Sequence, residues 1–173
     1  MLNPVLAGQN LTADFFNTSI DNARSMKYQK TDLTRNNTTT YLDSTDLVIA
    51  LAAGAAYTFE GLFFYDTSAT ADIKIRITLP TGAVSLISPW SSGTGISATA
   101  NPLNQQAVAD VSDVNEWIAG GVAIGTLMSI RPVGWINVTG AAGNLTVGFA
   151  QNTASAVNTL LKQGSWIALT RVF

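Results

Sequence analysis

The sequence contains neither cysteine nor histidine. Without cysteine there is no disulfide and no thiol nucleophile, so the fold must hold by packing alone. Without histidine the chain lacks the commonest general base and the commonest ligand of transition metals. A zinc, iron or copper site would have to be built from carboxylates, which suit those metals poorly. These absences argue against an enzyme, and we expect no cofactor and no metal.

Charge is also scarce, at 12% of residues, where typical soluble domains carry about 25%. The net charge is −2, and no run of basic residues provides the clustered cations that nucleic-acid phosphates require. We therefore expect no nucleic-acid partner. A surface this neutral repels neighbours weakly, which favours a subunit that packs against copies of itself or against a larger assembly. An ordinary β-protein with a low-charge surface is the simpler alternative.

The sequence also shows neither the pattern of a signal peptide nor that of a membrane span. The opening Met-Leu-Asn-Pro lacks a charged stretch followed by a long apolar one, so we expect no signal peptide and synthesis in the cytoplasm. The most apolar run, residues 47–65, is interrupted by Gly54, Thr58, Glu60 and Gly61. Two strands joined by a turn explain this run better than a membrane span, and we expect no membrane partner.

Period-two alternation dominates the later two thirds of the chain. In "ADIKIRITLP" (71–80), isoleucine and leucine alternate with polar residues, as in a half-buried antiparallel strand. The turn residues Pro80 to Ala83 then predict a hairpin with the next strand. About eight strands are expected, at 46–51, 56–65, 71–80, 83–88, 126–132, 134–139, 144–151 and 165–172. Between them, residues 91–125 have no clear pattern beyond one short strand near 108–111.

Eight short strands with turn-like connections predict an all-β protein, an antiparallel β-sandwich of jelly-roll type spanning residues 47–173. Residues 1–46 differ, because they contain one helix-like segment from Ala13 to about Asn22, with Thr12 as its N-cap, followed by mostly polar sequence. So few apolar side chains do not offset the entropy of ordering this stretch alone. We predict an N-terminal attachment arm that lies along a neighbour. Its contact residues are Phe15, Phe16, Ile20, Tyr28 and Leu33.

Carboxylates offer two weak candidates for chemistry. Asp110, Asp113 and Glu116 are three residues apart, but the alternating ligands and the glycine of a calcium loop are missing, which favours a solvated loop. Glu60 or Asp66 with Asp72 has the composition of a glycosidase pair, although outward positions on strands explain them more simply.

The four tryptophans favour a core or an interface between subunits over a sugar-stacking platform. Trp90 and Trp117 flank the irregular segment, which makes them the candidates for glycan contact.

Three segments resemble one family. "AGQNLTADFFN" (7–17), "TTTYLDSTDLVIALAAGAAYTFEGLFFY" (38–65) and "LTVGFAQNTASAVNTLLKQGSWIALTRV" (145–172) are similar to small structural proteins of tailed phages, especially those of actinobacterial hosts. The resemblance implies a jelly-roll virion component without catalytic residues, attached to the head or the tail. Our hypothesis is a non-enzymatic capsid decoration protein, a homotrimer that binds the major capsid or tail proteins through its arm. The alternative is a tail or head-fibre protein that binds host-surface carbohydrate.

Overall fold

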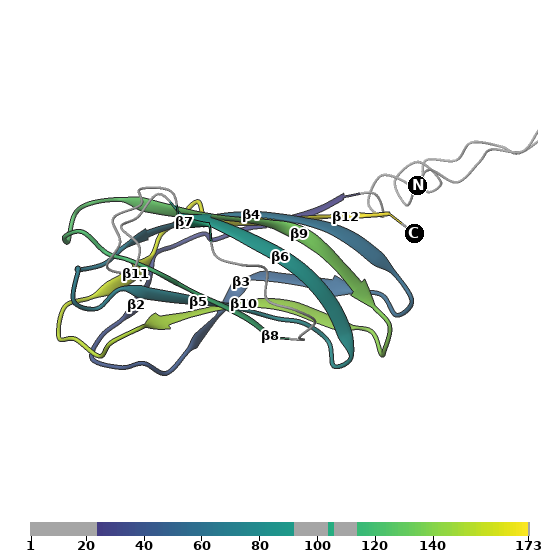
Figure 1. Ribbon diagram of the computed structural model, residues 1–173, viewed down its shortest axis with the longest axis horizontal. Coiled ribbons are helices and arrows are strands. Elements are labelled where there is room, and N and C mark those ends of the chain that lie inside the picture. The colour runs from purple at the N-terminus through teal and green to yellow at the C-terminus, as the bar shows by residue number, and fades with distance from the viewer. Residues whose placement is uncertain (1–23, 92–103, 106–113, 173) are drawn as a thin grey trace, which may run out of the picture.

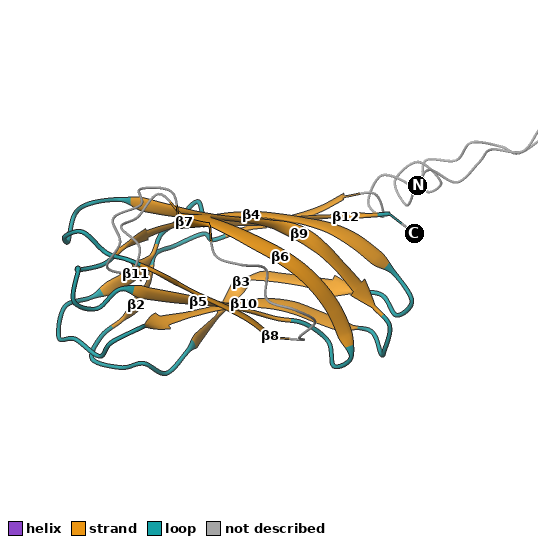
Figure 2. Ribbon diagram, in the orientation of Figure 1, coloured by secondary structure: helices purple, strands orange, loops and turns teal. Residues whose placement is uncertain are grey.

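The computed structural model describes residues 24–91, 104–105 and 114–172, and these residues form two antiparallel sheets (Figures 1 and 2). The described part contains no helix, and hence none long and apolar enough to cross a membrane. The expected helix at 13–22 and the expected strand at 108–111 lie outside the described residues. The same holds for Phe15, Phe16, Ile20, Asp110 and Asp113.

Eight strands form the larger sheet, the upper layer of Figure 1. They are β1 (Arg24–Tyr28), β2 (Leu33–Arg35), β4 (Ala56–Asp66), β6 (Ala83–Ser91), β7 (Asn104–Gln105), β9 (Met128–Val138), β11 (Thr159–Leu161) and β12 (Trp166–Arg171). Their order is β1-β12-β4-β9-β6-β7, and β11 joins β2 to β4. The smaller sheet is β3 (Leu42–Leu51), β10 (Gly143–Gln151), β5 (Ile73–Thr78) and β8 (Val114–Ala119), in that order.

The pairing is nested along the chain. β1 pairs with β12, β3 with β10, β4 with β9, and β5 with β8, so early strands pair with late ones. This nesting of four antiparallel pairs across two sheets is the arrangement of a jelly roll. β6 and β7 are inserted between the innermost pair and extend the larger sheet beyond β9. The predicted all-β sandwich of jelly-roll type is confirmed.

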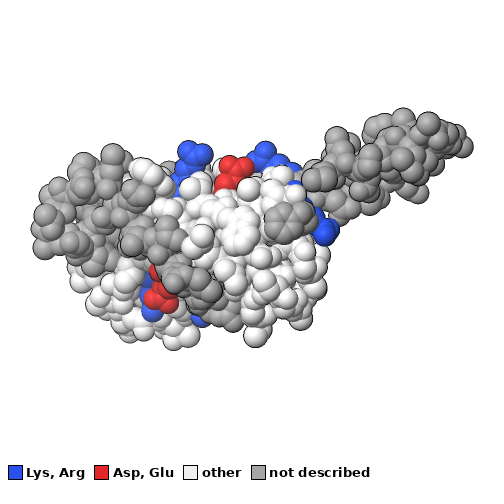
Figure 3. Space-filling view, turned by 45° about the vertical axis from the view of Figure 1, so that its right-hand side comes forward, with Lys and Arg blue, Asp and Glu red and all other residues white. Residues whose placement is uncertain are grey.

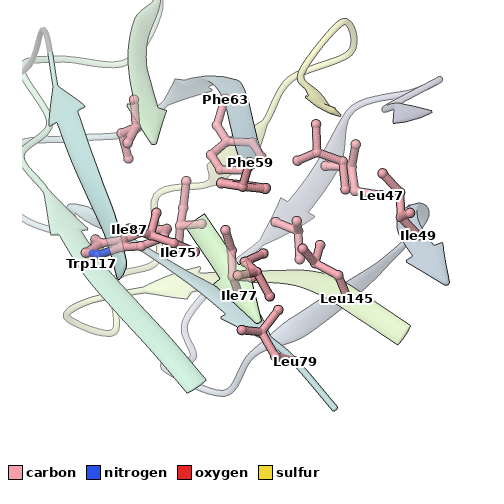
Figure 4. Close-up of a cluster of buried hydrophobic side chains, with 14 of the residues drawn as sticks. Leu47, Ile49, Phe59, Phe63, Ile75, Ile77, Leu79, Ile87, Trp117 and Leu145 are labelled. Atoms are coloured by element: carbon pink, nitrogen blue, oxygen red, sulfur yellow. The ribbon is translucent and has the colours of Figure 1, made fainter. Parts of the chain in front are cut away.

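Side chains from both sheets fill the space between the layers (Figure 4). Ile73, Ile75 and Ile77 on β5 are fully buried, as the alternation in the sequence predicted. Phe59 and Phe63 on β4 meet them from the larger sheet. Because each such side chain contributes roughly 1.5 to 3 kcal/mol when it leaves water, this single core accounts for the stability of the sandwich.

The predicted hairpin at residues 71–88 is wrong. The turn is present, because the Ala83 N–H donates to the Pro80 carbonyl at 3.0 Å. However, β5 belongs to the smaller sheet and β6 to the larger one, so this turn carries the chain across the core. Turn residues specify a reversal, and the partner of each strand is decided by the distant segments that compete for it.

Two of the expected strands are one. Residues 126–132 and 134–139 form parts of the continuous strand β9, although Pro132 lies in its middle. Opposite Pro132 the ladder with β4 is interrupted, between the pairs Glu60↔Val133 and Phe63↔Ile130. Proline has no N–H to donate, so the missing hydrogen bond is accommodated locally rather than ending the strand. With β8 and the short strands β1, β2, β7 and β11, none of which was expected, the described residues contain twelve strands instead of about eight.

The expected boundary between residues 46 and 47 is also wrong, because residues 24–46 are part of the sandwich. β1 extends the larger sheet beside β12, β2 pairs with β11, and β3 crosses the boundary. Gln29 is buried, and its side chain accepts a hydrogen bond from Ser44 at 2.6 Å and donates one to Asp46 at 3.1 Å. Counting apolar side chains left out the backbone ladders and these buried polar bonds, which hold the segment in place.

Candidate interaction face

The outer side of the larger sheet carries an unusual share of apolar side chains. Ile167 and Leu169 of β12 point into the core, so Trp166, which alternates with them, lies on the outer side. The register then places Tyr28 and Leu62 on either side of Trp166, on β1 and β4. We call this surface the aromatic face. Its members are Met26, Tyr28, Leu62, Leu86, Trp90, Val133, Trp135 and Trp166.

Several members of the aromatic face are far more exposed than large apolar side chains usually are. Tyr28 is 58% exposed, Met26 53%, Leu86 47% and Trp90 45%. The last two lie on the inserted strand β6, and Leu86 pairs with Trp135 on β9. The apolar surface therefore extends from the edge strand β1 across the sheet to the insertion. A continuous apolar patch on a folded chain is typical of an interaction surface.

Few charges interrupt the aromatic face. Arg24 donates to the Glu60 carboxylate at 2.7 Å, and this exposed pair largely satisfies itself. Arg131 is exposed on β9, and none of the ion pairs among the described residues includes it. Figure 3 shows the same sparseness over the visible described surface, where charged atoms form a few isolated groups. The face thus combines aromatic area with few charges.

The outer side of the smaller sheet is different, because charged side chains pair with one another across it. Arg76 of β5 donates to the Asp43 carboxylate of β3 at 2.9 Å, across Gly148 of the intervening strand β10. A Cβ at Gly148 would collide with that carboxylate, so glycine leaves the space in which the bridge forms. We call this surface, made of Tyr41, Asp43, Lys74, Arg76 and Glu116, the polar face.

Tyr41 covers the middle of the polar face. The Arg76 guanidinium carbon lies 4.2 Å from the centre of its ring, and the Lys74 ammonium nitrogen lies 4.7 Å from it. Both distances are within the range of cation–π attraction. Burial, and next the neighbouring Glu116 carboxylate, raise the pKa of Tyr41 above its ordinary range. The ring therefore stays neutral and closes this side of the sandwich.

The carboxylates that the sequence offered for catalysis hold backbone or form an ion pair. Asp66 accepts the Gly125 N–H at 3.0 Å on both oxygens, and Asp72 accepts the Gly121 N–H at 2.8 Å. Glu60 is paired with Arg24. Among residues 24–91, 104–105 and 114–172, no group of three or more potential metal ligands is close enough to hold an ion. Each of the three carboxylates is thus explained by local structure.

The loop that Asp66 and Asp72 hold presents a second, smaller apolar feature. Val122, Ile124 and Leu127 are all exposed in the connection between β8 and β9. Because the two aspartates bind its backbone, the loop keeps these side chains in fixed positions. In the sequence these three residues lie in the glycine-containing run "GGVAIGTL", which predicts a turn.

A hollow of about 290 Å³ lies between the edge strands β1 and β3. Across it, the Lys30 ammonium lies 3.4 Å from the Asp46 carboxylate. The Lys30 N–H donates to the same carboxylate at 3.0 Å and, with the ammonium, lowers the pKa of Asp46. This ion pair lines the hollow and makes it mainly polar. We therefore assign the pair a structural role at the margin of the aromatic face.

Of the residues predicted as contacts, some lie on the surface and others pack in the core. Tyr28 and Trp90 lie on the aromatic face, and both are exposed. Leu33 on β2 packs against the core of its own sandwich instead of projecting towards a neighbour. Trp117 is only 3% exposed and belongs to the core, so its expected role in glycan contact is wrong.

Trp117 is buried because it points inward from β8 and packs near Ile75 and Ile87 (Figure 4). Trp135 and Trp166 were not singled out in advance, although each precedes an isoleucine within a strand. In a strand, neighbouring residues point to opposite sides. Since Ile136 and Ile167 are buried, the two tryptophans must face outward.

The protein is a jelly-roll sandwich in which charged groups pair with one another on one outer side and apolar side chains are exposed on the other. No protein-family model and no curated protein matches the chain. Solved structures with partial similarity include that of infectious bursal disease virus Gx strain, at 11% identity and a TM-score of 0.21, and that of the infectious bursal disease virus VP2 subviral particle, at 9% and 0.22.

The alignments cover 86% and 87% of this chain and 39% and 40% of those chains. The chain therefore spans about two fifths of the length of these solved structures. At such TM-scores the similarity decides neither topology nor function, which are argued here from the chain itself.

Proposed function

We propose that the protein is a non-enzymatic structural subunit of a virus particle, a capsid decoration protein of a tailed phage that attaches through its N-terminal segment. The observation that carries the proposal is the aromatic face, an apolar surface larger than a solitary subunit needs. The virion assignment itself rests on the three segments that resemble phage structural proteins. A trimeric state and contact with the major capsid protein belong to the same proposal.

The attachment segment of this proposal is residues 1–23, because residues 24–46 form strands of the sandwich. These 23 residues hold the apolar Phe15, Phe16 and Ile20. Contact between apolar side chains and a neighbour's surface then supplies the binding free energy.

Incorporation into particles tests this proposal. Phe15→Ser with Phe16→Ser keeps the chain length and removes the two aromatic anchors, and we expect the variant to be lost from purified particles. Thr12→Ser is the matched control, because it alters the same segment without removing apolar surface. Particles that retain the double variant at the wild-type copy number would overturn the anchoring role.

A second function, binding of host-surface carbohydrate, is favoured by one observation. Trp90 and Trp166 lie on the same outer side of one sheet, where the exposed ring of Trp90 and the partly exposed ring of Trp166 can stack on sugars. Sedimentation with host cell walls tests it, with Trp90→Ala and Trp166→Ala as variants and Leu127→Ala as the control. Equal binding by all four proteins would remove this alternative.

A further inference from the structure

We propose that the aromatic face of each subunit binds residues 1–23 of a second copy. This inference rests on the proposed structural role, and it names the surface that the N-terminal segment recognises. Both sides of the contact are therefore supplied by copies of the same protein.

The first argument is complementary composition. Residues 1–23 contain two acidic residues, Asp14 and Asp21, and no lysine or arginine. This side of the sheet carries Arg24 paired with Glu60, Arg131 outside the ion pairs of the described residues, and Asp66 at the far end of β4. The large apolar residues of the segment include Leu2, Val5, Leu6, Leu11, Phe15, Phe16 and Ile20. An acidic, aromatic segment therefore matches an apolar surface on which Arg131 is available to a carboxylate.

The second argument is where the segment is attached. Arg24, the first residue of β1, pairs with Thr170, and β12 ends one residue later at Arg171. The chain therefore enters the sheet at the end of these two strands, beside the C-terminal end of the described chain (Figure 1). The segment is therefore attached at the edge strand of the larger sheet, from which a neighbouring copy is within reach.

The third argument is reach. Twenty-three residues extend over roughly 75 Å at most. The strands from β1 to β6 span about 19 Å at the usual spacing between strands. A segment from an adjacent copy is therefore long enough to cross from Tyr28 to Trp90 with residues to spare.

The contact has a defined symmetry. Each copy supplies one segment and one face, and the two surfaces differ, so the contact is of the head-to-tail kind. Such a contact closes into a ring when the rotation between copies allows it. A closed ring in which each aromatic face is occupied agrees with the trimer proposed above, and it would leave no unfilled face at the particle surface.

Photochemical cross-linking of the full chain tests the inference. Phe16 is replaced by p-benzoylphenylalanine, and this protein is mixed with an equal amount of a longer, tagged copy that carries no photoreactive residue. After irradiation we expect covalent products between the two chain lengths. Mass spectrometry should map the attachment to β6, β9 or β12 residues of the aromatic face.

Two variants of the recipient copy sharpen the result. Leu86→Lys with Trp90→Lys changes only exposed positions, so the fold is preserved, and we expect the yield of mixed products to fall about tenfold or more. Leu127→Lys changes an equally exposed apolar residue outside the aromatic face and should leave the yield unchanged. Circular dichroism of each variant verifies that the sandwich is intact.

Three outcomes would overturn the inference: products confined to single chains, products that map outside the aromatic face, or no products at all. Incorporation of the Phe15→Ser, Phe16→Ser variant into particles is measured separately. If that variant is lost from particles while cross-links between copies are absent, the segment binds another virion protein. In that case the inference fails and the proposed function stands.

Discussion

The two outer sides of the sandwich differ in how their side chains are kept from unfavourable contact with solvent. On the polar face, Arg76 bridges to Asp43 and stacks on Tyr41, so these charged and aromatic groups contact one another within the subunit. On the aromatic face, Trp90 and Leu86 project from an inserted strand and contact solvent. The difference indicates that one side is completed within the subunit and the other is left for a partner.

The inserted strand accounts for much of this asymmetry. A jelly roll with only the four nested pairs would have β9 at one edge of its larger sheet. β6 pairs along β9 from Ala83 to Ser91 and extends the aromatic face by one long strand. The insertion therefore widens the surface on which we propose that a second copy binds.

The largest expected effect contrasts two tryptophans. Trp117→Ala empties a large volume in the core, and we expect a loss of about 3 to 5 kcal/mol in the free energy of unfolding. Trp90→Ala removes an exposed ring, and the loss should stay within about 0.5 kcal/mol. Urea titrations followed by circular dichroism measure both. Comparable losses would mean that the aromatic face stabilises its own subunit and is not an open surface.

The next effect concerns two glycines, one in each sheet. In Gly134→Ala the new Cβ would overlap the backbone of β6, including Ile87 Cα at 2.7 Å, and would push β6 away from β9. We expect a loss of about 2 to 4 kcal/mol. Gly148→Ala meets only the end of the Asp43 side chain, which can rotate away, so its loss should be smaller. The reverse order in thermal unfolding would contradict this account.

The third effect compares two arginines. Arg76→Met removes the bridge to Asp43 and the contact with Tyr41, and we expect a loss of about 1 kcal/mol. Arg131→Met on the aromatic face should change stability by less than about 0.5 kcal/mol. According to the further inference, Arg131→Met should instead weaken the cross-link between copies. Equal stability losses in the two variants would contradict the conclusion that Arg76 stabilises its own subunit more than Arg131 does.

Much of the fold could be predicted from the sequence because alternation marks strands directly. The segments 46–51, 56–65, 144–151 and 165–172 all fall within or close to observed strands. Alternation does not indicate which strands pair with one another. Ala83 follows a genuine turn, yet its strand joins the opposite sheet, because β8 displaces β6 as the neighbour of β5. Nested pairing is a property of the whole chain and leaves no local mark.

The candidate site was harder to predict for two reasons. Residues 24–46 were counted by their apolar side chains alone, although β1 and β2 are held by backbone ladders and by buried polar groups such as Gln29. Trp117 was expected to be exposed because it flanks an irregular segment. The same alternation that reveals strands would have placed Trp135 and Trp166 outside, since each is followed by an isoleucine.

The smallest expected effect is a dependence on pH at the connection between β1 and β2. The Gln163 N–H donates to the Asp32 carboxylate at 2.8 Å, and Lys162 pairs with it, so both lower the pKa of Asp32 below its ordinary value. A lowered folded-state pKa stabilises the fold above the unfolded-state pKa. This contribution is lost as the pH falls through the folded-state pKa.

Asp32→Asn should therefore reduce stability by about 0.5 kcal/mol at pH 7, a small value because the carboxylate is partly exposed to solvent. The difference from the wild type should shrink as the pH falls through the unfolded-state pKa and then through the lowered folded-state pKa of Asp32, below which the carboxylate is protonated in both states. Thr31→Ala, at the neighbouring exposed position, should show no such dependence on pH. A constant difference between Asp32→Asn and the wild type from pH 7 to pH 3 would show that the charge of Asp32 does not hold this connection. The β1 edge, where the aromatic face begins, would then depend on its backbone ladder with β12 and on the bonds of Gln29 and Lys30.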